Sequence, residues 1–226
     1  MSVIAVLGAG PGLGTSVARR FGDEGYAAAL VSRRGFELPG ATSYAADLTD
    51  LAAVDDVLGR IKKDLGPIDT LYFGPASTTM DIRPLTEAGP AEVLAPIESI
   101  LLPAVAAVAA VLPDMLERGA GSLLLPAGLS GLRPMPILGS LAPVSAALRM
   151  YALTLHEALV PTGVFAGALT IGGMIARGDI HAMIAGQHPG ADLPTLDPDE
   201  IAQVAWRMTR DRTTAETVFE AALPVL

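Results

Sequence analysis

Four glycines near the start of the chain could bring the backbone against a phosphate group: Gly8, Gly10, Gly12 and Gly14. They follow a run of small and branched apolar residues over 2–7, and a helical pattern comes directly after them. Missing side chains leave room for a pyrophosphate, and the first turn of a helix has unpaired N–H groups that can bind it. The sequence therefore predicts a dinucleotide-cofactor site on this turn, with Leu13 between the last two glycines.

Two adjacent arginines come at the end of the next expected strand, in the sequence Ser32-Arg33-Arg34. A site for NAD usually has an acidic residue here, whereas a guanidinium can grip the 2′-phosphate of NADP. The sequence therefore favours NADP(H), with NAD(H) as the alternative. The same residues could also be a solvated basic pair at the end of a strand.

Two further positions fit a cofactor that lies along one edge of a sheet. Asp47-Leu48 follows the third expected strand, where a carboxylate can accept from the adenine amino group. Gly74 ends the fourth expected strand, where small residues let a ribose lie flat against the backbone.

The candidates for the chemistry itself are a few polar residues outside the expected strands. Ser130 and Ser140 flank the segment where a substrate would lie, and Arg133 in the same loop could polarise a carbonyl or bind a carboxylate. His181 and His188 could act as acids or bases near neutral pH. Loop hydrogen bonding is the plainer interpretation of the two serines. No metal site is predicted, because the chain has no cysteine and these histidines have no partners at ligand spacing.

The elements that must position these residues alternate between strand and helix patterns along all 226 residues. This alternation predicts a single α/β domain over 1–226, with a doubly wound, parallel, seven-stranded sheet of the Rossmann type. Asp50 and Asp197 stand at expected helix N-caps. We expect strands over 3–7, 28–32, 43–46, 70–73, 122–126, 164–170 and 217–221. We expect helices over 12–24, 51–65, 91–118, 143–159 and 198–209.

Three connections between these elements are unusual. The segment 33–42 joins the second and third strands with too few residues for a normal crossover helix, so we expect a short loop or a single turn. The segments 78–90 and 175–196 follow the carboxyl ends of strands, where ligands bind in open α/β sheets. The segment 175–196 is either a lid over a substrate or a plain surface excursion.

Composition limits the partners and the location. The net charge of −9 argues against nucleic acid or an anionic membrane as a partner. The first expected strand begins so early that it leaves no room for a signal peptide. The longest apolar run, 99–113, is shorter than the roughly 20 residues of a membrane span. We therefore expect a cytoplasmic protein with no membrane partner, in which the helix over 91–118 is buried at a subunit interface.

The order and spacing of these motifs resemble the short-chain dehydrogenases/reductases over nearly the whole chain. The glycine turn resembles that family's Gly-x-x-x-Gly-x-Gly, and Asp47-Leu48 resembles its adenine-contact pair. Phe73-Gly74-Pro75-Ala76 stands in for its Asn-Asn-Ala-Gly, and Ile171-Gly172 replaces its Pro-Gly turn near the nicotinamide. The resemblance implies an oxidoreductase, and a homodimer or homotetramer that pairs the helices over 91–118 and 143–159.

The same resemblance shows which catalytic groups are missing. The family uses a tyrosine acid, a lysine four residues later, a serine and an asparagine. Their positions fall on Leu141, Ser145, Gly128 and Ile100, respectively. No Tyr-x-x-x-Lys occurs anywhere in the chain, and a positioned general acid contributes about 10²–10⁴-fold to a rate. The family's catalytic residues therefore cannot be carried over to this chain.

Three functions are open on these grounds. The first is a divergent NADP(H)-dependent oxidoreductase that acts on a carbonyl or an alcohol, with protonation by water or by a residue such as Ser140. The second is a non-redox enzyme, such as a cyclase, isomerase or lyase, that orients its substrate in the same pocket. The third is a catalytically inactive protein that binds NADP or a partner. The apolar loop over 129–138 predicts a small hydrophobic substrate or ligand.

Overall fold

A seven-stranded parallel sheet in the order β3-β2-β1-β4-β5-β6-β9 forms the centre of the computed structural model, which describes residues 1–190 and 194–221. The strands are β1 (Val3–Leu7), β2 (Ala27–Ser32), β3 (Ala41–Ala45), β4 (Thr70–Phe73), β5 (Gly121–Gly128), β6 (Val164–Gly172) and β9 (Glu216–Glu220). The order reverses between β1 and β4, as in doubly wound folds. The predicted fold class is confirmed, and each of the seven expected strands is present.

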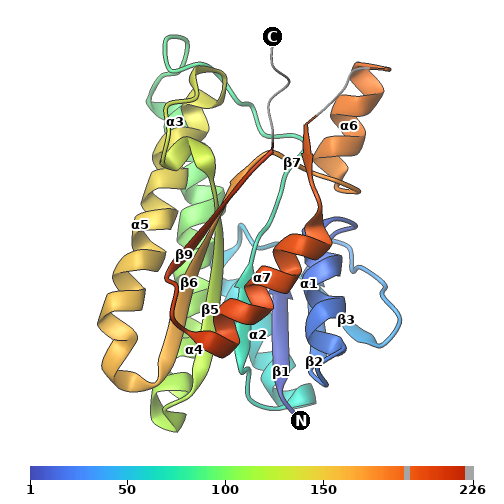
Figure 1. Cartoon of the computed structure of the whole chain (residues 1–226), viewed down its shortest axis with the longest axis vertical. Helices are drawn as coiled ribbons and strands as arrows, with labels where there is room; N and C mark the ends of the chain where they lie inside the picture. The colour runs from blue at the N-terminus through green and yellow to red at the C-terminus, as the bar shows by residue number, and fades with distance from the viewer. Residues whose placement is uncertain (191–193, 222–226) are drawn as a thin grey trace.

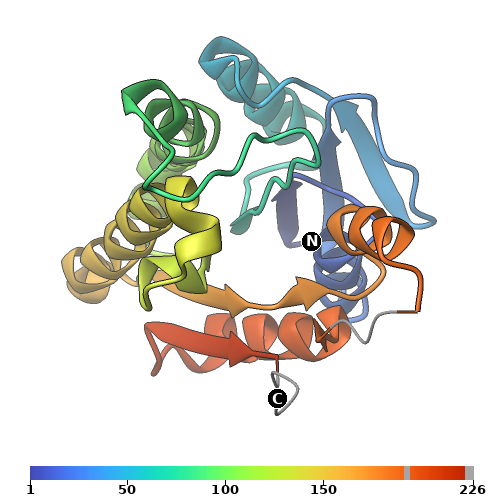
Figure 2. The ribbon, with the colours of Figure 1, turned by 90° about the horizontal axis from the view of Figure 1, so that it is seen from above.

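Helices cover both faces of the sheet (Figures 1 and 2). The helices α1 (Leu13–Gly22) and α7 (Pro198–Asp211) pack on one face. The helices α2 (Leu51–Leu65), α4 (Leu102–Arg118) and α5 (Ala142–Leu159) pack on the other. Because both faces are covered, the strands are continuous apolar runs instead of alternating patterns.

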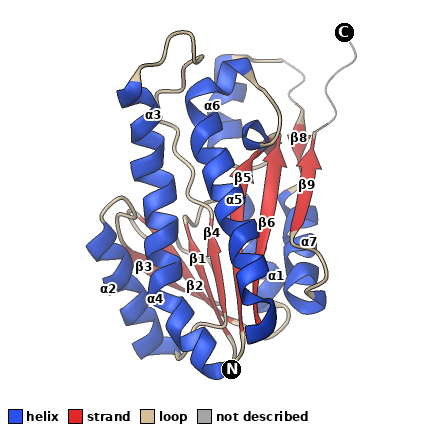
Figure 3. Ribbon diagram, turned by 90° about the vertical axis from the view of Figure 1, so that its left-hand side faces the viewer, coloured by secondary structure: helices blue, strands red, loops and turns tan. Residues whose placement is uncertain are grey.

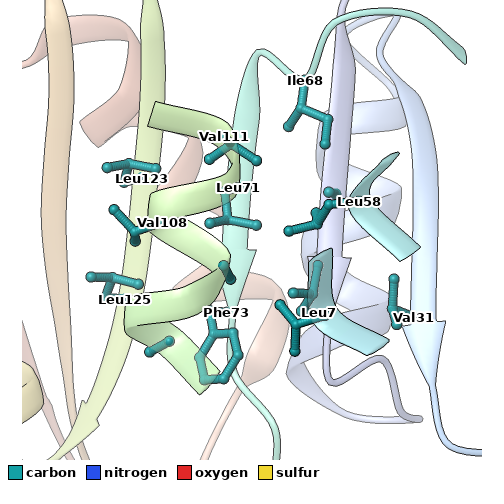
Figure 4. Close-up of a cluster of buried hydrophobic side chains, with 14 of the residues drawn as sticks. Leu7, Val31, Leu58, Ile68, Leu71, Phe73, Val108, Val111, Leu123 and Leu125 are labelled. Atoms are coloured by element: carbon teal, nitrogen blue, oxygen red, sulfur yellow. The ribbon is translucent and has the colours of Figure 1, made fainter. Parts of the chain in front are cut away.

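The strand β1 shows how this sequence fills both faces. All five of its residues are buried, with Ala5 and Leu7 in the cluster under α2 and α4, and Ile4 and Val6 in the cluster under α1 and α7. Figure 4 shows Leu7 beside Phe73 in the first of these clusters. A run of this kind can only be a strand at the centre of the sheet.

Two aspartates begin helices as predicted. The Asp50 carboxylate accepts from the N–H groups of Ala52 and Ala53, at 3.0 and 3.4 Å, and begins α2. The Asp197 carboxylate accepts from Asp199 N–H at 2.9 Å and begins α7. Both bonds satisfy N–H groups that have no partner inside the helix.

The helix predicted over 91–118 has three parts. It begins as α3 (Pro90–Pro96), continues as the π-helical turn η1 (Ile97–Leu101), and ends as α4. Pro103 has no N–H, so it cannot bond the carbonyl four residues earlier, and the wider turn lies next to this gap. Ile100 lies within this irregular turn.

Two helical stretches are long and apolar enough to cross a membrane by length and composition. They are Pro90–Arg118, with 29 residues, and Pro136–Thr162, with 27 residues; an 18-residue window of each has a mean hydropathy of 2.0 and 1.3, respectively. The argument from the short run 99–113 therefore does not hold, because the helix extends beyond it. Each stretch packs one side on the sheet, as core helices of α/β domains do, so the two are weak support for a span.

The two unusual connections beside β2 and β6 differ in content. The residues between β2 and β3 form turns without a helix, as expected. The segment after β6 contains β7 (Met174–Ile175), α6 (Asp179–Gln187) and β8 (Thr195–Leu196). The strands β7 and β8 pair in parallel as a separate small sheet. Residues 191–193 of the predicted lid lie outside the described residues.

Candidate cofactor and active site

The turn between β1 and α1 lies directly against the end of β4. Gly8 has a φ of +88°, which glycine adopts without strain. A Cβ atom at Gly8 would lie against Pro75 Cα and 2.7 Å from the carbonyl carbon of Gly74. The N–H groups of Gly8 and Ala9 both donate to Val31 O, at 3.0 and 2.9 Å. The turn is thus held between β2 and β4 with no room for a side chain.

The first turn of α1 presents N–H groups that can bind an anion. Gly12 is the N-cap and supplies no side-chain hydrogen bond, and the first turn has no acidic residue. Among the residues that the structure describes, neither Leu13 N–H nor Gly14 N–H donates a hydrogen bond, whereas Thr15 N–H donates to Gly10 O at 3.1 Å. Free N–H groups at the positive end of a helix favour a pyrophosphate.

The ends of β2 and β3 bring the predicted basic and acidic cofactor residues to one place. Arg33 and Arg34 are exposed, and neither makes an ion pair or a side-chain hydrogen bond within the described parts of the chain. Asp47 Oδ1 accepts from the N–H and the hydroxyl of Thr49, at 3.0 and 2.8 Å. These bonds, with a smaller contribution from the positive charge of Arg33, lower the pKa of Asp47. Ser32 is half-buried beside them and Leu48 is buried.

Gly74 contacts both its own strand, β4, and the end of β1 where the glycine turn begins. Its N–H donates to Leu7 O at 2.9 Å, which extends the β1–β4 pairing. A Cβ atom at Gly74 would lie 2.6 Å from the Tyr72 hydroxyl. Tyr72 is buried in the core, and burial raises the pKa of its phenol. The Tyr72 ring therefore occupies the space that a larger side chain at position 74 would need.

The carboxyl ends of β5 and β6 bring together five of the predicted site positions. Gly128 pairs with Ile171 in the ladder between these strands, one residue before Gly172. Ser130, in the 3-10 turn η2 (Leu129–Gly131), donates to Ser145 Oγ at 3.3 Å. A Cβ atom at Gly128 would lie 2.9 Å from the same oxygen. This corner of the site therefore contains two serine hydroxyls that bond to each other.

The other two positions of the family's catalytic set are apolar here. Leu141 ends the 3-10 segment η3 (Pro136–Leu141) and is half-buried. Ile100 lies in η1 and packs against the core under α4. Neither side chain can donate or accept a proton, and Gly128 and Ser145 have no charge. The fold is thus that of the family, whereas the four positions assigned from the sequence hold neither an acid nor a cation.

Ser140 has a structural contact that its sequence position did not reveal. It is fully buried, its hydroxyl accepts from Arg83 N–H at 3.0 Å, and its own N–H donates to Arg83 O at 2.8 Å. These two bonds hold the segment after β4 against η3. The hydroxyl can reach a substrate only if this contact opens, so a catalytic role for Ser140 stays a prediction.

Arg133 and His181 lie apart from the two serines. Arg133 Nη1 is 2.6 Å from Glu220 Oε2 at the end of β9, so its charge is already paired at the surface. His181 is half-buried on α6, in the segment after β6. The backbone of Arg133 lies near Gly128, since its N–H donates to Leu129 O at 2.9 Å, but its guanidinium binds Glu220. The catalytic roles of Arg133 and His181 therefore stay predictions.

The segment after β6 lies on the glycine turn, which the sequence did not reveal. A Cβ atom at Gly12 would lie 2.9 Å from Gly178 Cα and 3.1 Å from Ile175 Cγ2. Arg177, between these two residues, makes an ion pair with Asp199 of α7 at 2.7 Å. No sequence signal indicated this arginine, since its partner is 22 residues away and the contact depends on how the segment folds back.

The parallel sheet with its reversal of strand order and the glycine turn before α1 define a Rossmann-type α/β domain. A family model described as short chain dehydrogenase matches residues 2–179. The chain therefore belongs to the short-chain dehydrogenase family. A short chain dehydrogenase of Pseudocercospora fijiensis is 26% identical over 200 residues, which are 81% of this chain. The match spans 64% of the length of that curated relative.

Solved structures with the same fold cover nearly the whole chain. ElxO, described with NADP bound, has a TM-score of 0.82 and 17% identity, covering 97% of this chain and 96% of its own. YwfH, described as an NADPH-dependent reductase in bacilysin biosynthesis, has a TM-score of 0.84 and 15% identity, covering 100% and 99%. A short-chain dehydrogenase from Streptomyces avermitilis has a TM-score of 0.80 and 21% identity, covering 96% and 87%. At these identities the likeness shows the fold.

Proposed function

We propose that this chain binds NADP(H) and acts as an oxidoreductase on a hydrophobic carbonyl or alcohol, without the family's Tyr-Lys pair. The observation that carries the proposal is the combination of two anion sites at one edge of the sheet. The free N–H groups of Leu13 and Gly14 suit a diphosphate, and the exposed Arg33 and Arg34 suit a 2′-phosphate. The names of ElxO and YwfH, which mention NADP and NADPH, support the same choice.

The residues of this chain would have distinct parts in such a reaction. When bound, NADPH supplies the hydride, so the protein needs to bind, orient and help to protonate. The α1 N-terminus would hold the diphosphate, and Asp47 would accept from the adenine amino group. The hydroxyls of Ser130 and Ser145 would orient the substrate oxygen. The Ser145 hydroxyl accepts from Ser130, so it can donate its own proton to the substrate oxygen. The proton would come from water or from one of these hydroxyls.

The test is a titration of the protein with NADPH and with NADH, followed by nicotinamide fluorescence. We expect NADPH to bind more tightly. In the double variant Arg33→Ala/Arg34→Ala, the Kd for NADPH should rise about 10–100-fold, as expected for the loss of one or two hydrogen bonds to a charged group. The Kd for NADH should not change, because NADH has no 2′-phosphate.

The matched control is Arg207→Ala/Arg210→Ala on α7, which removes the same charge from exposed positions. Arg210 lines a hollow with Ser2 at the amino end of the sheet, far from the turn. This variant should bind both cofactors like the wild type. If neither cofactor binds below millimolar concentration, the proposal fails. If the Arg33/Arg34 variant keeps the same preference, the assignment of NADP fails.

A second candidate is a protein that binds NADP(H) without redox chemistry, including a non-redox enzyme that uses the same pocket. The observation that favours it is that the four positions assigned from the sequence to the family's catalytic set, Ile100, Gly128, Leu141 and Ser145, hold no charged side chain. A panel of hydrophobic ketones and aldehydes with saturating NADPH separates the two candidates. Consumption of NADPH supports the oxidoreductase, and a tightly bound cofactor that is never oxidised supports the second candidate.

We also infer that two copies pair through α4 and α5, with a cytoplasmic location as expected from the sequence. Figure 3 shows these helices side by side on one surface of the sheet. Their outer sides expose large apolar residues, including Leu102 at 42% and Met150 at 56%. A second copy would cover these side chains, which would otherwise contact water. The small residues of α4, such as Ala106 and Ala109, would let the helices approach closely.

A further inference from the structure

The backbone at Arg177 has an unusual conformation that directs the chain back onto the glycine turn. Arg177 has a φ of +66°, a region that non-glycine residues rarely adopt. Two hydrogen bonds fix the turn around it: Ala176 N–H to Leu196 O at 3.0 Å, and Gly178 N–H to Ile175 O at 3.1 Å. Strained conformations of this kind persist only where the surroundings hold them, and they cluster at functional sites.

One nitrogen of the Arg177 guanidinium, Nη2, makes the contacts that hold the group in place. Its Nη2 is 2.7 Å from Asp199 Oδ2, 3.4 Å from Asp197 Oδ1 and 3.5 Å from Ser16 Oγ. Within the described residues, its Nε and Nη1 donate no hydrogen bond, and 53% of the side chain is exposed. Ser16 also donates to Asp199 Oδ1 at 2.6 Å, so the whole group is tied to α1. The guanidinium is therefore oriented and still has donors for a ligand.

The position of this charge matches the place where a diphosphate would bind. Ser16 is in the fourth position of α1, and its N–H donates to Gly12 O at 3.2 Å. Gly178, next to Arg177, lies against Gly12. Figure 1 shows α6 and β7 beyond the end of α1 at which the helix begins. Arg177 is thus a cation that contacts the first turn of α1 through the Ser16 hydroxyl.

Several carboxylates stand near the turn, and Arg177 is the cation that lies among them. Asp179 Oδ2 would lie 3.9 Å from a Cβ atom at Gly10, and Asp197 and Asp199 flank the guanidinium. A helix N-terminus supplies only about half of a positive charge, and the diphosphate has two negative charges. Arg177 offsets part of this negative charge beside the turn.

We propose that Arg177 is a cofactor-binding residue whose guanidinium binds the diphosphate of NADP(H), with Asp199 orienting it over the first turn of α1. This proposal rests on the proposed function, since it names a further residue of the same site. The fork of donors on a guanidinium suits two phosphate oxygens at once. The diphosphate is common to NADPH and NADH, so Arg177 binds both, whereas Arg33 and Arg34 distinguish between them.

The test compares Arg177→Met with the wild type for three probes: NADPH, NADH and adenosine 2′-monophosphate. The variant should bind NADPH and NADH about tenfold more weakly, at the lower end of the range for a hydrogen bond to a charged group because the side chain is half exposed. Its affinity for adenosine 2′-monophosphate, which has no diphosphate, should stay within twofold of the wild type. Arg207→Met, an exposed position on α7, is the charge-matched control and should leave all three affinities unchanged.

A second variant separates binding by the guanidinium from a purely structural role. Asp199→Asn breaks the ion pair but keeps the positive charge of Arg177. We expect its Kd for NADPH to stay within about threefold of the wild type, since the charge still faces the turn and a competing carboxylate is gone. If this variant loses as much affinity as Arg177→Met, then Arg177 acts only by tying the segment to α7, and the proposal is wrong.

The failure of this proposal is distinct from the failure of the proposed function. A wild-type protein that binds neither dinucleotide overturns both. A wild-type protein that binds them, with an Arg177→Met variant that binds them equally well, overturns only the role of Arg177. A loss confined to NADPH and adenosine 2′-monophosphate also overturns it, because the guanidinium would then contact the 2′-phosphate.

Discussion

The conformation of the glycine turn depends most on the missing side chain at Gly8, and the variant Gly8→Ala tests this directly. Two separate penalties apply. The positive φ costs a residue with a Cβ atom about 1–2 kcal/mol. The close approach of Pro75 and Gly74 leaves the new methyl group no space, and overpacking of this kind costs about 1–3 kcal/mol. The free energy of unfolding should therefore fall by roughly 2–5 kcal/mol, a large part of the stability of a typical domain.

Gly25 is a matched control in the same chain. It has a φ of +86°, close to that of Gly8, but a Cβ atom at Gly25 would meet nothing within 4 Å. Gly25→Ala should therefore lower the free energy of unfolding only by the conformational penalty, about 1–2 kcal/mol. The difference between the two variants measures the contact between the turn and β4.

The assay is urea unfolding at neutral pH, followed by circular dichroism, with the wild type and both variants under one set of conditions. The midpoint for Gly8→Ala should be well below that for Gly25→Ala, with the same slope. Equal midpoints for the two variants would show that the turn can move away from Pro75 at no cost. In that case the close backbone approach does not define the cofactor site.

Two further predictions concern the edge strand and the assembly. Arg149 binds Glu216 of β9 through two hydrogen bonds of 2.6 Å, and these bonds lower the pKa of Glu216. A carboxyl group with a lowered pKa stabilises the fold at a pH above its unfolded value of about 4.3. Glu216→Gln should therefore lower the free energy of unfolding by about 1–3 kcal/mol at pH 7. Urea unfolding should show this difference shrinking as the pH falls below about 4. A difference independent of pH would contradict the role of the charge. The second prediction is a dimer or tetramer mass by light scattering, which Leu102→Glu/Met150→Glu should convert to a monomer; a monomeric wild type would contradict the pairing through α4 and α5.

The order of the elements and the glycine turn could be predicted because both depend on residues that are close together in the sequence. An apolar run such as Val3–Leu7 can only be a buried strand, and four alternating glycines before a helix allow few structures. The N-caps at Asp50 and Asp197 follow the same logic, since each bonds to N–H groups two or three residues away. The boundaries of β5 and β6 were less accurate, because their last residues are strands only through pairing with each other.

The surroundings of the candidate site residues could not be predicted from the sequence. Ser140 and Ser130 are similar loop serines in sequence, yet one bonds the backbone of Arg83 and the other bonds Ser145. Arg133 has its charge paired by Glu220, which is 87 residues away. A hydroxyl or a guanidinium bonds whatever the fold brings to it, and the sequence does not contain those distances.

The sequence by itself determined the family-type fold, the glycine turn and the absence of a Tyr-x-x-x-Lys motif, because these depend on residue types at short spacing. Only the tertiary structure decided which polar groups meet at the site. It brought the hydroxyls of Ser130 and Ser145 together beside Gly128, and it placed Arg177 over the first turn of α1. Both results depend on contacts between segments that are far apart in the chain, and only the packed sheet and helices bring those segments together.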